Sequence, residues 1–322
     1  MHASNNDPGL WLATFKVELS SASANLYGNT RQQAELRLTA EVQPGQPPLT
    51  TDQLSSLLLV VELADGTYEQ LPYSGTGTLG WWQSLERDTR YDLMPGAGNA
   101  TSSSTGNTSV ASKLLYVSTH HAGGSNVKLR AQIKKDANTT YYTDAAAGFE
   151  TYVTLTTVHP PTFSESDYQW LKAIDEGDIN NMFLHEYALR LKMLGFSSPS
   201  VLDVTGMIRW HRNESSETYA TYVGMALPGV EKTVHYNEAI RTGPDFKPNS
   251  TAKSPDSDAL ILVLQGADNI PFNREGLDHG GPCKVRLVDR HGNDHYVLFR
   301  FSSEGSDLDR RTNIVVSYSV VE

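Results

Sequence analysis

The chain has 322 residues, 39% of them hydrophobic and 20% charged, a composition typical of a folded globular protein rather than a disordered one. Its formal net charge of -11 disfavours nucleic acids and anionic membrane surfaces as partners, because like charges repel. A single cysteine, Cys283, excludes a framework of disulfide bonds within the chain. A chain of this length predicts roughly two domains, each with a core of its own.

The N-terminal residues contain neither a basic segment nor an apolar one, so we expect no secretory signal peptide. No apolar run approaches the roughly 20 residues of a membrane-spanning helix. These features predict a protein without a membrane span that stays in the cytoplasm or leaves the cell by a signal-independent route.

The first half of the sequence reads as short strands separated by turn residues. Residues 33–42 alternate apolar and polar side chains, the period-2 pattern of a strand with one buried face. The next two strands flank Asp65-Gly66, a dipeptide typical of hairpin turns. Further strands are predicted at residues 114–118, 127–133 and 151–158. This arrangement predicts a β-sandwich.

The clearest domain boundary is Pro160-Pro161, because consecutive prolines cannot continue a strand ladder. After it, Ser164 is placed to cap a helix, and apolar residues recur at helical spacing up to Leu194. The sequence therefore predicts a helical hairpin over residues 164–194.

Strand patterns return after the predicted hairpin. They are predicted at residues 207–211, 218–227, 259–265, 285–288, 296–301 and 314–321, with long loops at 96–109 and 241–258. Residues 163–322 are therefore predicted to form a second domain of class α+β, in which a helix pair joins a mainly antiparallel sheet.

Two segments of the first half carry a more specific pattern. One runs from Ala24-Asn25-Leu26-Tyr27-Gly28-Asn29 into the alternating strand Ala34–Val42, and the other from Tyr116-Val117-Ser118-Thr119 through Ala122-Gly123-Gly124 into Val127–Ile133. Over residues 10–158 this pattern resembles the bacterial immunoglobulin-like domains of the invasin and intimin type. The resemblance implies an immunoglobulin-like sandwich over residues 1–162. Members of that family occur in exported adhesins and virulence factors, where they act as spacers and recognition units.

Trp81 and Trp82 stand together beside a glycine-rich loop, and Tyr73 and Tyr91 lie nearby in the sequence. Clustered aromatic rings can stack on a sugar ring or anchor a protein partner. Alternatively, one indole fills the core and the other lies on its rim. We predict these four residues as candidate ligand contacts.

His279, Cys283, His291 and His295 fall within a short span and are all residue types that bind zinc. They are candidate metal ligands. The alternative is an exposed polar hairpin tip between the strands on either side of residues 289–294.

The sequence contains no Gly-x-Ser-x-Gly elbow, no Walker loop and no Cys-x-x-Cys pair. We therefore expect a non-enzymatic, cofactor-free protein of bacterial or phage origin that binds a protein or glycan surface in adhesion, virulence or host interaction. Two alternatives stay open. One is a toxin or enzyme effector with its site near residues 278–295, and the other is a structural subunit of a larger assembly, including a homo-oligomer.

Overall fold

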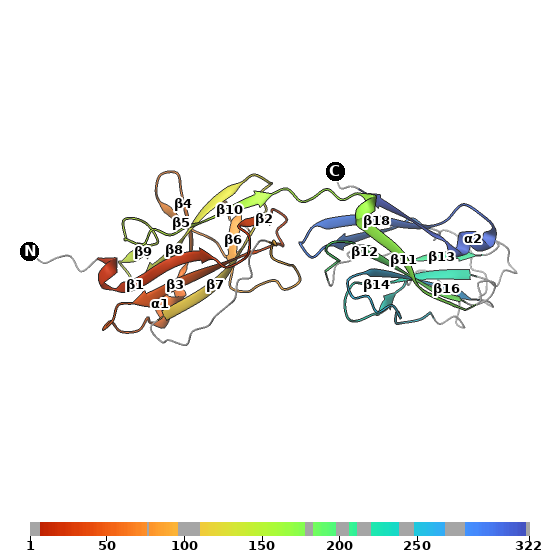
Figure 1. Ribbon diagram of the computed structural model, residues 1–322, viewed down its shortest axis with the longest axis horizontal. Coiled ribbons are helices and arrows are strands. Elements are labelled where there is room, and N and C mark those ends of the chain that lie inside the picture. The colour runs from red at the N-terminus through yellow and green to blue at the C-terminus, as the bar shows by residue number, and fades with distance from the viewer. Residues whose placement is uncertain are drawn as a thin grey trace, which may run out of the picture. The chain divides into compact units, whose positions relative to one another are not determined.

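The computed structural model describes residues 7–75, 77–95, 110–177, 183–197, 206–210, 220–237, 248–267 and 281–319. Within these ranges the chain is mainly β, and its helices are single short turns. None of the described helices is long and apolar enough to cross a membrane. The chain divides into two compact units, Met1–Pro160 (unit 1) and Pro161–Glu322 (unit 2), each drawn in Figure 1.

Unit 1 consists of two antiparallel sheets with one parallel pair. The first sheet has the order β1-β3-β7-β6, and the second has the order β2-β10-β8-β4-β5, with β9 paired to β8. The strands are β1 (Leu12–Leu19), β2 (Asn25–Tyr27), β3 (Ala34–Val42), β4 (Leu58–Glu62), β5 (Tyr68–Gln70), β6 (Trp81–Ser84), β7 (Val110–Thr119), β8 (Asn126–Lys134), β9 (Thr140–Tyr142) and β10 (Val153–Val158). The short helices are η1 (Pro8–Leu10) and α1 (Thr51–Ser55).

Alternation along the strands builds the core of unit 1. Every second residue of β3 is buried, as the pattern of residues 33–42 predicted. Leu36 and Val117 of the first sheet belong to the same apolar cluster as Leu59 and Leu129 of the second, so the two sheets pack against each other. Burying such side chains contributes about 1.5–3 kcal/mol each. The predicted mainly β character is confirmed.

Unit 2 contains two further antiparallel sheets (Figure 1). One has the order β11-β12-β16-β14-β13, with β15 paired to β14, and the other has the order β17-β18-β19. The strands are β11 (Tyr168–Gly177), β12 (Phe183–Leu191), β13 (Met207–Trp210), β14 (Ala220–Ala226), β15 (Val234–His235), β16 (Leu260–Ala267), β17 (Cys283–Val288), β18 (Asp294–Phe301) and β19 (Ile314–Ser319). The short helices are η2 (Glu165–Asp167) and α2 (Asp307–Thr312).

The predicted helical hairpin over residues 164–194 is wrong. Ser164 does begin a helical turn, but η2 ends at Asp167, and β11 and β12 then pair antiparallel. The strand β12 is buried on both faces, with Leu189 in one apolar cluster and Ala188 in another. A strand buried on both faces loses its period-2 pattern, so its apolar residues imitate helical spacing. Residues 178–182 of the predicted hairpin lie outside the described ranges.

The six strands predicted after residue 200 are present as β13, β14, β16, β17, β18 and β19. The predicted loop at 96–109 lies outside the described residues, as does the part of the 241–258 loop that precedes residue 248. The three strands β17, β18 and β19 pack on the larger sheet of unit 2, because Val285, Val297 and Phe299 share a cluster with Leu189 and Leu262.

We predict that the two units fold independently, because each contains an apolar cluster of its own. The fragments 1–160 and 161–322 should each unfold in one cooperative transition in urea, followed by circular dichroism. Their midpoints should match two components of the unfolding of the full chain. Fragments that stay unfolded while the full chain unfolds in a single transition would contradict independence.

Candidate functional site

The four aromatic residues predicted as ligand contacts separate into a buried pair and an accessible pair. Burial alternates along β6, so Trp81 enters the core with 4% exposure, while Trp82 faces outward and is half-buried. Tyr91 is buried, whereas 47% of Tyr73 is exposed. A ligand could therefore contact Trp82 and Tyr73 directly, and the other two support the scaffold.

Trp82 and Tyr73 line one open groove on unit 1 with a volume of about 580 Å³, which we call the β6 groove. It lies along an edge strand, with walls supplied by the segment after β2, the β5–β6 connection and the turn after β6. Its other lining residues are Thr30, Arg31, Gln33, Ser84, Glu86, Arg87, Asp88, Thr89, Arg90 and Ser118.

The indole of Trp82 is held in place by its neighbours. Trp82 pairs with Ser118 of β7 across the sheet. A Cβ atom on Gly75 would lie 3.2 Å from the Trp82 ring, so the backbone of that loop contacts the indole directly. The His120 ring lies 6.1 Å from it, centroid to centroid. This packing fixes the ring before any ligand arrives, which reduces the entropy lost on binding.

A strained backbone forms part of the groove wall. Thr30 has φ of +68°, and among the residues that the structure describes no other non-glycine has a positive φ. A left-handed conformation costs about 1–2 kcal/mol and is unusual for a β-branched residue. The Asn29 side-chain oxygen accepts hydrogen bonds from the backbone N–H groups of Arg31 (3.1 Å) and Gln32 (2.9 Å), which stabilises the turn. Such outliers concentrate at binding sites.

The turn after β6 contains an ordered ion pair. The Arg90 guanidinium donates to both carboxylate oxygens of Asp88, at 2.9 and 2.7 Å. This hydrogen bonding lowers the pKa of Asp88 below its usual value. The same guanidinium lies 5.4 Å from the centre of the Tyr91 ring. Arg90 therefore serves mainly to build the wall of the groove.

Cys283 and His295, two of the predicted zinc ligands, are not brought together. Cys283 pairs with Phe299 and His295 with Leu287, at opposite ends of the β17–β18 hairpin. The two residue pairs are four residues apart along the strand, which separates them by roughly 13 Å. Zinc lies only about 2.0–2.3 Å from each atom that binds it, so one ion cannot reach both side chains. His279 lies outside the described residues. Among those described, no group of three or more His, Cys, Asp or Glu side chains is placed to hold a metal ion.

His291 and His295 instead belong to a buried network centred on Asp289, whose side chain is fully buried. The His295 ring lies 3.1 Å from the Asp289 carboxylate through Nε2, and 2.7 Å from the Tyr168 hydroxyl through Nδ1. Asp289 also accepts the backbone N–H groups of His291 (2.8 Å) and Asn293 (2.9 Å). The alternative prediction of an exposed polar hairpin tip is therefore wrong, because the turn folds inward around a carboxylate.

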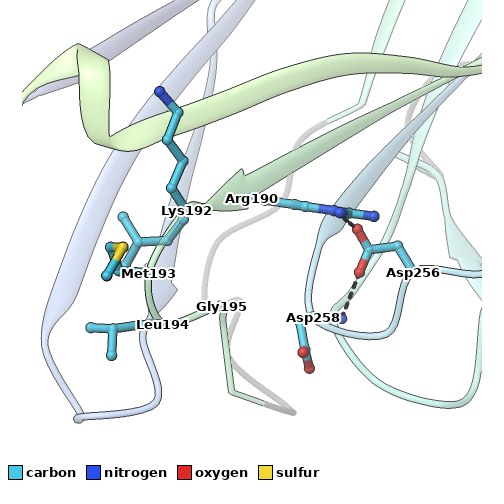
Figure 2. A pocket seen from close by; sticks show the side chains of 8 residues that line it. Arg190, Lys192, Met193, Leu194, Gly195, Asp256 and Asp258 are labelled. Carbon is cyan, nitrogen blue, oxygen red and sulfur yellow. Dashed lines mark hydrogen bonds and ion pairs between the residues drawn. The ribbon is translucent and has the colours of Figure 1, made fainter.

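A second pocket, of about 330 Å³, lies in unit 2 beside the tip after β12. Figure 2 shows that Arg190 points at Asp256, to which it donates, and that the backbone N–H of Asp258 donates to the same carboxylate at 3.0 Å. Lys192 extends away from this group and donates to the Ser166 carbonyl oxygen at 2.6 Å. The pocket's cations are thus engaged by the protein itself, and the β6 groove is the better candidate site.

Sequence reasoning found two of the groove's aromatic residues and missed its arginines. Arg87 and Arg90 stand in the run Glu86-Arg87-Asp88-Thr89-Arg90 shortly after the tryptophan pair, and this dense run of charges was an available signal. Arg31 carried no such signal, because it is far from Trp82 in the sequence and joins the groove only through the fold.

Trp81 and Trp82 provide a matched test of the geometry. We expect Trp81→Ala to lower the free energy of unfolding by about 3–5 kcal/mol, since it empties a site in the core. Trp82→Ala should lower it by roughly 1 kcal/mol or less, because the residue lies at the surface of the sheet. Urea unfolding of both variants measures the difference. Equal losses would show that Trp82 is a core residue.

The buried network makes a separate prediction. Removing the Asp289 carboxylate or the His295 ring by alanine should cost about 3–5 kcal/mol, because each leaves buried polar groups without partners. Asp289→Asn should cost less, since an amide oxygen still accepts the backbone hydrogen bonds. His235→Ala, which changes the exposed residue of β15, is the control, with an expected change within about 0.5 kcal/mol. Similar small losses at His235 and His295 would refute the network's role.

No protein-family model matches the sequence, and no curated protein is significantly similar to it. Among solved structures, a match is found to the Yersinia pseudotuberculosis adhesin InvE, with 12% sequence identity and a TM-score of 0.21. The match covers 89% of this chain and 59% of that chain, so this chain spans less than two thirds of the length of the adhesin.

Proposed function

We propose that this protein is a non-enzymatic recognition protein that binds a protein or glycan surface through the β6 groove of unit 1. The observation that carries the proposal is the fixed, half-buried indole of Trp82, which shares an open groove with the exposed Tyr73. Aromatic side chains supply apolar contact area at low entropic cost, and the polar groups around them give direction to the contact. A groove on a rigid sheet is a suitable scaffold for such binding.

We infer further that unit 1 is an immunoglobulin-like sandwich. In one sheet, β1, β3, β7 and β6 correspond to strands A, B, E and D of that fold, and in the other β4, β8 and β10 correspond to strands C, F and G. This correspondence supports the resemblance to invasin- and intimin-type domains found in the sequence. A role in adhesion or host interaction in a bacterial or phage setting is the function that this resemblance favours.

Binding of the purified full chain to immobilised oligosaccharides and to immobilised extracellular proteins tests the proposal. Ligands bound by the wild type should lose affinity by roughly 30-fold or more in Trp82→Ala, as expected for an aromatic hot spot. Trp82→Phe should retain part of the affinity, because the ring face is kept. The matched control is Tyr152→Ala, which removes an exposed aromatic residue of unit 1 outside the groove.

Two results would count against the proposal. If Trp82→Ala left every interaction unchanged, the groove would not be the binding site. If Trp82→Ala and Tyr152→Ala weakened binding equally, the effect would come from general aromatic surface rather than from the groove.

A further inference from the structure

We propose that the β6 groove selects a glycan carrying an anionic group, a carboxylate or a sulfate ester, with Arg87 holding the anion while the sugar ring stacks on Trp82. This inference rests on the function proposed above and names the class of ligand for that same site.

The two arginines of the turn after β6 differ in what they already bind. Arg90 donates from Nε and Nη2 of its guanidinium to the two carboxylate oxygens of Asp88. Arg87 is exposed, lines the groove, and makes no hydrogen bond or ion pair with any residue that the structure describes. Burial raises the pKa of Tyr116 on β7, and the charge of Arg87 opposes that rise. Its planar fork of donors is therefore available to a ligand.

The backbone on both sides of Arg87 is fixed by side chains of the groove. The Ser84 hydroxyl accepts from the Glu86 N–H (3.0 Å) and donates to the Glu86 carbonyl oxygen (2.9 Å). On the other side, the Asp88 N–H donates to the Gln33 side-chain oxygen at 2.7 Å. Arg87 thus projects from a held turn, and less conformational entropy is lost when it engages a ligand.

The Arg87 guanidinium and the Trp82 indole together favour one class of ligand. A guanidinium matches the geometry of a carboxylate or sulfate through two parallel hydrogen bonds. An indole face matches the apolar face of a sugar ring. A chain with net charge -11 repels anions at long range, so an anionic ligand must gain its affinity from a local cation such as Arg87.

The first probes are oligosaccharides ending in a carboxylated sugar, and the same chains with the carboxyl group reduced to an alcohol. The others are an otherwise neutral oligosaccharide bearing a sulfate ester, with its unsulfated form, and an acidic peptide. The wild type should bind at least one anionic sugar roughly 10- to 100-fold more tightly than its neutral counterpart, the range expected for charge-assisted hydrogen bonds. This preference should weaken as salt is raised. Comparison of the affinities for the carboxylated and the sulfated probes identifies which anionic group the groove prefers.

Variants of Arg87 complete the test. Arg87→Gln should abolish the preference for the charged probe without changing the melting temperature, since the side chain is exposed. Arg87→Lys should retain part of it, because the charge remains but the fork is lost. Arg37→Gln on β3, outside the groove lining, is the matched control and should behave as wild type.

Four results would overturn the inference. They are equal binding of charged and neutral sugars, a preference that survives Arg87→Gln, binding of the acidic peptide alone, and no binding of any probe. In the first two cases, a loss of binding in Trp82→Ala would leave the proposed recognition function standing. A Trp82→Ala variant that bound every tested surface as well as the wild type would show that the proposed function itself had failed.

Discussion

The attachment of the edge strand β6 to the body of unit 1 determines where the groove can form. Trp81 enters the apolar core, and the fully buried amide of Gln83 donates to the Leu71 carbonyl oxygen and accepts the Leu59 N–H from the opposite sheet. A buried amide that lost these partners would cost about 1–3 kcal/mol, so the strand is held in one register. Because side chains alternate, this register obliges Trp82 and Ser84 to face outward.

Unit 2 uses its polar residues differently. Asp289, His295 and Tyr168 form a chain of hydrogen bonds inside the sandwich, and the Phe163 ring packs 4.6 Å from the His295 ring, centroid to centroid. The network joins the β17–β18 turn to the segment that leads into β11. Buried polar groups with satisfied hydrogen bonds can impose one arrangement on a core that apolar packing alone would leave less specific. His295 therefore has a structural explanation.

The contrast between the two halves explains what the sequence could predict. Residues 33–42 bury one face only, so their alternation survives and β3 was identified nearly to its ends. The strand β12 is buried on both faces and β11 contains a register shift between Lys172 and Ile174, so neither shows a clean period of two. Sequence reasoning read both as helices for that reason. At the candidate site, the neighbouring Trp81 and Trp82 could be recognised from the sequence. Ser118 could not, because only the pairing of β6 with β7 places it beside Trp82.

The turn that walls the groove has a second consequence, which concerns self-association. β6 is an edge strand of only four residues, and its Gln83 N–H donates to the Pro72 carbonyl oxygen at 2.8 Å, so part of its edge is already occupied. The rest of an edge invites pairing with the edge of another molecule. After Leu85 comes the charged run from Glu86 to Arg90, and charges beside a short edge oppose such pairing. The residues that shape the groove thereby also oppose edge-to-edge pairing of the sheet. The sequence of this turn is therefore constrained, because a neutral, apolar turn would leave the short edge without charges that oppose pairing.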